Sequence, residues 1–228
     1  MQKKPYIIIA LGGSLIVKDD VRIDFLKPFR ALIEKLIGQG HRFVIVAGGG
    51  KITRRYQKAA AHIVRVPNED LDWLGIHATR LNAHLLRTIF WNRAYPVVVD
   101  DLKKPIHGRP NLLIAGGTRP GWSTDYVSVM LARRFGSKRV IVAGTYDAVY
   151  DKDFEKYPNA KRLPHLDWKS YRALIGNHWK PGLRAPVDPI AAKAAQRHRM
   201  RIDIVRAEDF TNFKRCIGGR PFRGSIID

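Results

Sequence analysis

Tyr6-Ile7-Ile8-Ile9-Ala10-Leu11-Gly12-Gly13-Ser14-Leu15 is an apolar run that ends abruptly in two glycines and a hydroxyl. Its β-branched residues predict a buried strand. Glycine lets the backbone amides that follow a strand approach an anion closely, because no Cβ stands in the way, and such amides can converge on a phosphate. The stretch therefore predicts a buried strand that leads into an anion-binding turn.

The same pattern occurs twice more along the chain. Residues 43–51 read FVIVAGGGK and residues 112–118 read LLIAGGT, so each is again an apolar run that ends in glycines. One such turn is weak evidence, whereas three turns at strand ends indicate a site for more than one phosphate. A helix launched at residue 51 would add the positive potential of its N-terminal amides.

Strand and helix patterns alternate along the chain, and this decides the fold class. Beside residues 6–11, strands are predicted over residues 43–47, 95–99, 111–115, 139–143, 202–205 and 225–227. Helices are predicted over residues 25–37, with Asp24 as N-cap, and over residues 51–62, 69–91, 123–135, 167–175, 188–199 and 208–217. Residues 101–110 and the charged interval 145–164 are predicted loops. The alternation predicts a three-layer α/β/α sandwich around a mainly parallel sheet, with ligands beyond the carboxyl ends of the strands.

Composition limits the function classes. The 228 residues are 45% hydrophobic, enough for a full core, and carry 41 Lys+Arg against 20 Asp+Glu, a net charge of +21. A nucleic-acid-binding protein is one interpretation of this charge, but the basic residues are spread along the chain, which favours a solvated basic surface. The single Cys216 excludes an internal disulfide framework and fits a reducing compartment. No apolar stretch approaches the ~20 residues that cross a bilayer, so we expect a cytoplasmic protein.

Seven blocks in order carry a resemblance to a known family. They are Leu11-Gly12-Gly13-Ser14; Gly48-Gly49-Gly50-Lys51-Ile52-Thr53-Arg54; Asp72-Trp73-Leu74-Gly75-Ile76 with Thr79-Arg80-Leu81-Asn82-Ala83; Gly116 to Asp125 (GGTRPGWSTD); Asp147-Ala148-Val149-Tyr150; Val187 to Lys193 (VDPIAAK); and Gly224-Ser225-Ile226-Ile227. Together they cover nearly the whole chain. The chain resembles the amino-acid-kinase superfamily and, within it, the archaeal-type uridylate (UMP) kinases.

The resemblance implies a fold, a reaction and partners. It implies one amino-acid-kinase-like domain over residues 1–228, with the phosphoryl acceptor on the side of residues 1–140 and ATP on the side of residues 141–228. The implied reaction transfers the γ-phosphoryl group of ATP to UMP and gives UDP and ADP, a step of pyrimidine nucleotide biosynthesis, with Mg²⁺ as the usual cofactor. It also implies a homo-oligomer, a hexamer built from dimers. The sequence does not identify metal ligands.

The same resemblance implies roles for individual residues. Lys193 would neutralise charge on the moving phosphoryl group and Asp125 would orient the catalytic cations. ATP would contact Gly13, Ser14, Gly50, Arg54, Gly144, Tyr150 and Asp153. UMP would contact Gly49, Asp72, Thr118, Arg119, Pro120, Gly121, Trp122, Ser123 and Thr124, with Asp72 accepting hydrogen bonds from the ribose hydroxyls.

The residues taken singly leave plainer interpretations open. Asp72 could be a helix N-cap, and Asp125 a first-turn carboxylate that complements the helix dipole. Tyr150 could be a core residue, and Lys193 a surface lysine. The glycines could serve turns alone.

Three departures from the family pattern affect the function. A lysine common two residues before the first loop glycine is Ala10, a usual Thr-Asn-Val-Asp-Gly-Val-Tyr block reads GTYDAVY over residues 144–150, and a histidine common after Pro-Gly is Trp122. Relatives that act on acetylglutamate or isopentenyl phosphate carry a histidine where this chain has Ala47, which favours UMP. The alternatives are a catalytically weak nucleotide-binding regulator on the same fold, or a kinase for another small phosphate or carboxylate acceptor.

Overall fold

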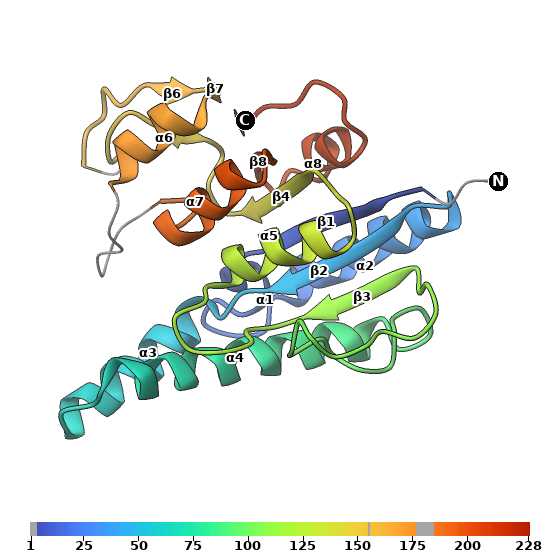
Figure 1. The fold of residues 1–228 in the computed structure, drawn as a ribbon, viewed down its shortest axis with the longest axis horizontal. Coiled ribbons are helices and arrows are strands. Elements are labelled where there is room, and N and C mark those ends of the chain that lie inside the picture. The colour runs from blue at the N-terminus through green and yellow to red at the C-terminus, as the bar shows by residue number, and fades with distance from the viewer. Residues whose placement is uncertain (1–3, 155, 177–184) are drawn as a thin grey trace.

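A seven-stranded sheet forms the centre of the computed structural model, which describes residues 4–154, 156–176 and 185–228 (Figure 1). The strand order is β3-β2-β1-β4-β8-β9-β7. The strands are β1 (Tyr6–Leu11), β2 (Arg42–Ala47), β3 (Leu112–Ala115), β4 (Arg139–Gly144), β7 (His165–Leu166), β8 (Arg201–Arg206) and β9 (Ser225–Ile227). Within the sheet, β8 and β9 pair antiparallel and the other neighbours pair parallel. A separate hairpin joins β5 (Val149–Tyr150) to β6 (Arg162–Leu163).

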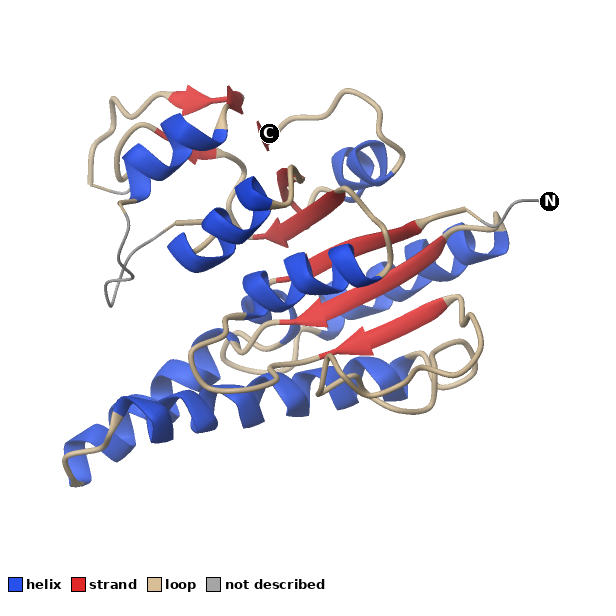
Figure 2. Cartoon of the chain, viewed as in Figure 1, coloured by secondary structure: helices blue, strands red, loops and turns tan. Residues whose placement is uncertain are grey.

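Helices cover both faces of this sheet (Figure 2). They are α1 (Gly13–Ile16), α2 (Ile23–Gly38), α3 (Gly50–Ile63), α4 (Asn68–Ile89), α5 (Thr124–Arg134), α6 (Trp168–Ile175), α7 (Pro189–Arg197) and α8 (Phe210–Ile217). One hydrophobic cluster joins the sheet to α5, α6 and α7, and a second joins it to α1, α2, α4 and α8. The predicted α/β/α sandwich with a mainly parallel sheet is confirmed.

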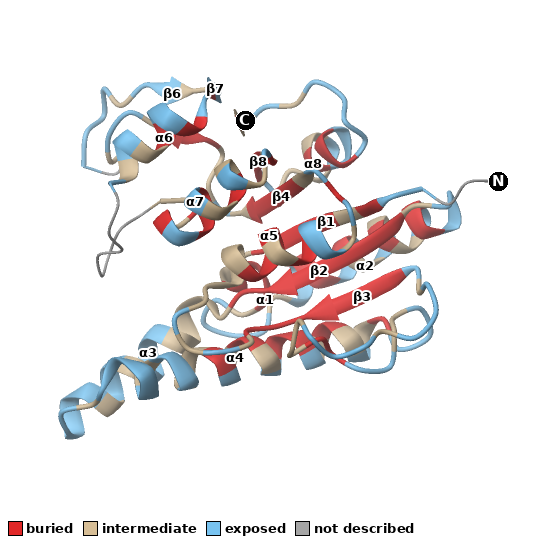
Figure 3. Ribbon diagram, in the orientation of Figure 1, coloured by how far each residue is buried: buried red, intermediate tan, exposed pale blue. Residues whose placement is uncertain are grey.

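The strands contribute residues to both hydrophobic clusters because successive side chains of a strand point to opposite faces of the sheet. Ile8 and Ala10 of β1 belong to the α5 cluster, whereas Ile9 and Leu11 belong to the α2 cluster. All six residues of β2 are buried, as expected for a central parallel strand covered on both sides (Figure 3). The helix α3 differs, since none of its residues is fully buried, and its far end reaches beyond the sheet together with the start of α4 (Figures 1 and 3).

The structure corrects three details of the predicted elements. Residues 95–99 form no strand: Ala94 and Val99 make only isolated bridges to β3, because Pro96 has no amide to donate to a ladder. Asp24 is not the N-cap of α2, which begins one residue earlier and has Arg22 at the cap position. The interval 145–164 contains the hairpin β5–β6, whose two-residue strands are too short to show a periodic pattern.

The carboxyl ends of four neighbouring strands lie level at one edge of the sheet. Leu11 pairs with Ala47 on one side and with Ala143 on the other, and Val46 pairs with Ala115. The three predicted glycine turns and Gly144 therefore begin at the same edge. From β1, the strands β2 and β3 are added on one side and β4 and β8 on the other, so the strand order reverses next to β1. Ligands of open α/β sheets bind at such a switch point.

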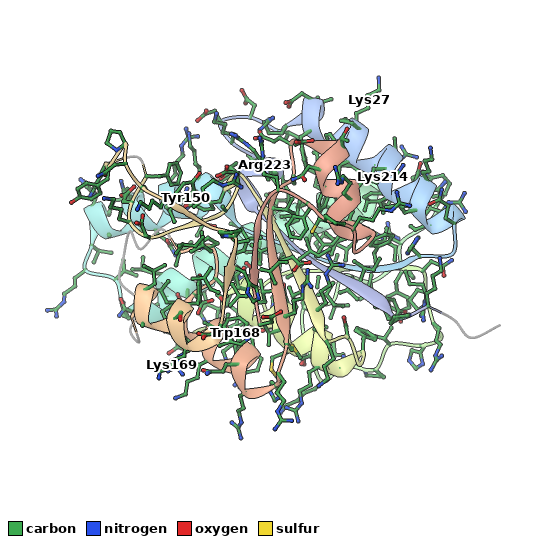
Figure 4. The ribbon with its side chains drawn as sticks, turned by 90° about the horizontal axis from the view of Figure 1, so that it is seen from above. Lys27, Tyr150, Trp168, Lys169, Lys214 and Arg223 are labelled. Atoms are coloured by element: carbon green, nitrogen blue, oxygen red, sulfur yellow. The ribbon has the colours of Figure 1, made fainter. Side chains whose placement is uncertain are left out.

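Positive charge is present on both faces of the sheet. Lys27 of α2 and Lys169 of α6 are exposed, and these helices pack on opposite faces of the sheet; Figure 4 shows both side chains projecting outward on opposite sides of the molecule. In the described residues, no helix has the length and apolar character that a membrane span requires.

Candidate active site

The first two glycine turns touch each other through their main chains. A Cβ on Gly13 would stand 2.5 Å from the Gly48 carbonyl oxygen, and a Cβ on Gly48 would stand 2.7 Å from the Gly13 nitrogen. Gly50 has φ +69°, a left-handed conformation that glycine adopts without strain. The Gly48 amide donates to Leu11 O at 2.8 Å, and the Gly12 amide donates to Ala143 O at 2.8 Å. Glycine is required here by close approach as well as by turn geometry.

A cavity of about 330 Å³, which we name the loop cavity, opens where these turns meet. It brings together five of the residues predicted to contact ATP, and the predicted catalytic Asp125, with Ala10 on the same wall. Those five are Gly13, Ser14, Gly50, Arg54 and Gly144. Its walls come from the ends of β1, β2 and β4 and from the first turn of α5.

A second cavity of about 250 Å³, the α4 cavity, lies between α4, the start of α3 and the turn after β3. It contains most of the predicted UMP contacts: Gly49, Asp72, Arg119, Trp122, Ser123 and Thr124. Asp72 lies inside α4, four residues after its start at Asn68, so the N-cap interpretation is wrong. Its Oδ2 accepts instead from the Gly121 amide at 2.8 Å.

Three predicted UMP contacts do not line the α4 cavity. Pro120 and Gly121 line none of the cavities described here. Thr118 lines a neighbouring cavity of about 360 Å³ beside Lys103. Arg119 and Trp122 form the partition between that cavity and the α4 cavity, with the Arg119 guanidinium 3.7 Å from the Trp122 ring centroid.

The loop cavity and the α4 cavity share a wall. Gly49, Gly50, Arg54 and Thr124 line both of them. Arg54 is exposed near the start of α3, where the N-terminal amides of a helix already favour negative charge. Two anionic groups bound in the two cavities would therefore meet at one arginine and one main-chain turn.

A third cavity, of about 310 Å³, adjoins the loop cavity through Tyr146 and Pro186. It contains Tyr150 and Asp153, the remaining predicted ATP contacts. The Tyr150 ring lies 4.7 Å from the Phe154 ring, and the Tyr150 hydroxyl donates to Asp147 Oδ1 at 3.0 Å. Tyr150 is half-buried and faces this aromatic cavity, so the core interpretation is wrong.

Asp125 lines the loop cavity, and the charge of a second carboxylate, Asp188, acts on it. Burial, and after it the charge of Asp188, raise the pKa of Asp125 to about 8, although a hydrogen bond from the Asp188 amide acts against the shift. Asp188 caps α7 by accepting from the amides of Ile190 at 2.8 Å and Ala191 at 3.1 Å. It also accepts from the Ser123 hydroxyl, and Ser123 caps α5. A bound cation would relieve the electrostatic cost at Asp125.

Lys193 is not brought to these cavities. It is exposed on α7 and lines none of the four. Lys51 forms an ion pair with Asp19 at 3.7 Å and lines none of the four cavities either. Of the cations considered from the sequence, Arg54 is therefore the one that lines the loop cavity.

The residues present fit a magnesium ion that is held partly by substrate. In the described part of the chain no three His, Cys, Asp or Glu residues group closely enough to hold a metal by themselves. Mg²⁺ is commonly bound by one or two carboxylates together with substrate phosphates. Asp125 supplies such a carboxylate in the loop cavity, beside the hydroxyl-bearing Ser14, Thr124 and Thr145.

Comparison with known proteins identifies the class. Residues 5–206 match the amino acid kinase family, and the chain belongs to this family. It is 38% identical over 227 residues to the uridylate kinase of Thermococcus onnurineus (strain NA1), which covers 97% of this chain and 99% of that protein. It is 30% identical over 229 residues to the uridylate kinase of Hyperthermus butylicus, with coverage of 100% and 99%.

Solved structures agree with this class. The crystal structure of uridylate kinase from Archaeoglobus fulgidus superposes with a TM-score of 0.83 at 25% identity, covering 99% of this chain and 100% of that chain. The UMP kinase from Bacillus anthracis superposes with a TM-score of 0.76 at 18% identity, over 99% of this chain and 97% of that chain, and supports the fold alone.

Proposed function

We propose that this chain is a UMP kinase, which transfers the γ-phosphoryl group of ATP to UMP and gives UDP and ADP. The observation that carries the proposal is the shared wall of Gly49, Gly50, Arg54 and Thr124, because phosphoryl transfer requires donor and acceptor phosphates to meet in line. The kinship with uridylate kinases at 30–38% identity over nearly the full chain supports the choice of UMP.

We assign the nucleotides to the cavities as follows. The aromatic cavity with Tyr150 and Asp153 takes adenosine, and the loop cavity takes the ATP phosphates, so the donor side is formed largely by residues after 140 together with the two glycine turns. The α4 cavity takes UMP. Asp72 has one oxygen engaged by the Gly121 amide and a second oxygen to accept from the ribose hydroxyls.

Catalysis in this arrangement rests on positioning and on positive charge. Arg54 and the main-chain amides of the glycine turns stabilise the charge that develops on the transferred group. Asp125 would hold Mg²⁺ together with the ATP phosphates, and the ion would neutralise further charge there. The role of Lys193 remains a proposal that the sequence match supports.

The remaining partner assignments are proposals of the same kind. We propose a homo-oligomer in the cytoplasm. Cys216 is free and buried in α8, and burial raises the pKa of its thiol to about 12, so it is unreactive as well as unpaired. A reducing compartment suits such a cysteine, although it does not require one.

One observation favours a second function. Ala10 lines the loop cavity at the position where the resemblance implies a lysine, so that lysine is missing beside the proposed donor phosphates. A protein that binds nucleotides without efficient transfer would have this feature. Turnover separates the two functions, since both bind nucleotide.

The test is a coupled assay of ADP release with Mg·ATP and a panel of acceptors: UMP, CMP, AMP, GMP, acetylglutamate and isopentenyl phosphate. A UMP kinase gives the highest kcat/KM with UMP. Binding of UMP and ATP without ADP release would make the nucleotide-binding regulator the better function. Preference for acetylglutamate or isopentenyl phosphate would move the chain to another branch of its family.

A further inference from the structure

Glycine turns that bind anions cannot hold themselves in place. They have no side chains to pack, so their positions depend on hydrogen bonds to their backbone groups. The helix α4 faces the sheet with Ile76, Ala83 and Leu86, as its amphipathic spacing requires, but two polar residues share that buried face. Thr79 is 7% exposed and Asn82 is 2% exposed. Buried polar side chains in a helix are costly unless they are bonded, so their partners indicate their purpose.

Thr79 and the next residue, Arg80, form hydrogen bonds with the turn that follows β3. The Gly117 amide donates to Thr79 Oγ1 at 2.6 Å, while the Thr79 hydroxyl donates to Ile76 O at 2.7 Å. The Gly117 carbonyl accepts from Arg80 Nε at 3.0 Å, and the Thr118 carbonyl accepts from Arg80 Nη2 at 3.1 Å. Both backbone groups of Gly117 are therefore fixed by consecutive residues of one helix.

Asn82 forms its hydrogen bonds with the glycine turn that follows β2. Asn82 Nδ2 donates to Gly48 O at 2.8 Å, with Gly49 O at the outer limit of 3.5 Å. Thr79 also reaches this turn, because its methyl group stands 3.4 Å from where a Cβ on Gly49 would be. A Cβ on Gly117 would lie 2.8 Å from Thr79 Oγ1. Thr79 thus separates Gly49 from Gly117, and one helical turn contacts both loops.

We propose that residues Thr79 to Asn82, one helical turn of α4, are a positioning element. They set the distance between the loop at Gly117, on the side of the phosphoryl acceptor, and the loop at Gly48–Gly50. The inference rests on the proposed function, in which these loops border the two phosphates. A helix is rigid over one turn, so residues three apart keep a fixed spacing of about 4.5 Å along its axis. A shift of about 1 Å in one loop would misalign donor and acceptor and cost on the order of 10²-fold in rate.

Thr79 gives the sharpest test because two substitutions separate the role of its hydroxyl from the role of its shape. Thr79→Val keeps the shape and removes the acceptor of the Gly117 amide, whereas Thr79→Ser keeps the hydroxyl. We expect Thr79→Val to lower kcat by roughly tenfold or more and to raise KM for UMP, with KM for ATP changed by less than about threefold. Thr79→Ser should keep kcat within about threefold of the unaltered protein.

Ser137→Ala is the matched control. Ser137 is 8% exposed, donates to Arg139 O at 3.0 Å and accepts from the Arg139 amide at 3.3 Å, at the opposite end of β4 from the cavities. The Ser137→Ala substitution should lower Tm and leave kcat and the KM values for UMP and ATP unchanged. If Thr79→Val also lowered Tm only, Thr79 would be a structural residue and the inference would be overturned.

Arg80 provides a second pair should Thr79→Val fail to fold. Arg80→Lys keeps the charge but loses the planar fork that reaches both carbonyls, and Arg80→Met keeps only the stem. We expect both to raise KM for UMP with little effect on ATP, and normal KM for UMP in both would count against the positioning role.

The dissociation constant for UMP alone, measured by titration, keeps the two hypotheses apart. If the unaltered protein does not turn over UMP, the proposed function fails, yet weaker UMP binding by Thr79→Val than by Thr79→Ser would still support the loop-setting role. If the unaltered protein turns over UMP and the two variants match it in kcat and affinity, only the inference fails.

Discussion

A Cβ placed on Gly50 would stand 2.6 Å from the carbonyl carbon of Gly13, so the turns after β1 and β2 are in direct main-chain contact. The contact brings these two glycine turns within one cavity. It also means that the two turns cannot be altered independently.

Gly13→Ala tests this contact. The added methyl would stand 2.5 Å from Gly48 O, which forces the turns apart. We expect a loss of activity on the order of 10²-fold, because small displacements of reacting groups have effects of this size. Gly38→Ala is the control, since nothing lies within 4 Å of its Cβ position at the end of α2; it should leave activity unchanged. Near-normal activity in Gly13→Ala would show that the turns can separate without harm.

Asp72→Ala tests the acceptor side. Loss of charge-assisted hydrogen bonds to the ribose should weaken UMP binding by on the order of 1.5–3 kcal/mol, and ATP binding much less. Calorimetric titration of each nucleotide measures both effects. Asp70→Ala, an exposed carboxylate in the first turn of the same helix, should change neither. Equal weakening of both nucleotides would indicate that Asp72 acts only by holding the Gly121 amide.

The pKa of Asp125, raised to about 8 by burial and by Asp188, predicts a pH dependence. The folded state holds a proton that the unfolded state releases near pH 4, so between pH 4 and pH 8 the free energy of unfolding falls as the pH rises. Asp125→Asn removes this slope. We therefore expect Asp125→Asn to have a higher Tm than the unaltered protein at pH 8 without ligand, with the difference vanishing near pH 4. A parallel pH dependence of Tm in the two proteins would contradict the shift.

The same carboxyl predicts proton release when the metal–nucleotide complex binds. A cation near Asp125 lowers its pKa, so binding of Mg·ATP at pH 7 should release close to one proton. Titration calorimetry in buffers of different ionisation enthalpy measures this number. The Asp125→Asn protein should release correspondingly less and should also lose kcat. Unchanged proton release in Asp125→Asn would place the metal away from this residue.

Arg54 and Lys193 are compared as the source of catalytic charge. Arg54 lines the wall that both cavities share, so Arg54→Met should lower kcat by roughly 10²-fold, the effect expected of a charge that acts mainly in the transition state. Lys193→Met is the contrasting variant. The sequence match predicts a similar loss there, with little change in UMP affinity. Near-normal kcat in Lys193→Met would exclude Lys193 from the catalytic machinery.

The scattered basic residues predict weak, non-specific attraction to nucleic acid. Exposed cations lie on opposite faces of the molecule, as Lys27 and Lys169 show. Any binding to DNA or RNA should fall steeply with salt, as counterion release requires, and should show no sequence preference. A filter-binding titration from low to physiological salt measures this. Tight, selective binding at physiological salt would show that a specific nucleic-acid site exists.

Local signals predicted much of the fold. The alternation of apolar runs and amphipathic helices predicted the sheet and its layers. The prediction was wrong at residues 95–99, where the apolar pattern is that of a strand but Pro96 prevents a ladder. The strands of β5 and β6 are only two residues long, and they pair because the chain folds back around Asp151, which a periodic pattern cannot show.

The site was predictable in its glycine turns and less so in its helices. Thr79 and Asn82 carry a signal, since polar residues on the buried face of an amphipathic helix need partners, but the sequence does not say which partners. Asp125 is close to Asp188 because Ser123 and Asp188, which are 65 positions apart, cap neighbouring helices and bond to each other. Likewise, Lys193 has the expected place in the motif, yet it lines none of the four cavities found among the described residues.

The helix α3 starts inside the site at Gly50 and has no fully buried residue. Few apolar contacts hold it, so we expect its local unfolding to require less free energy than opening of the sheet, and its amides to exchange hydrogen faster. Such an opening would remove Arg54 and Gly50 from both cavities at once while the core stays intact. Ligands that bridge the shared wall should slow exchange in α3 most of all, which makes its amides a reporter of substrate binding that is separate from the stability of the fold.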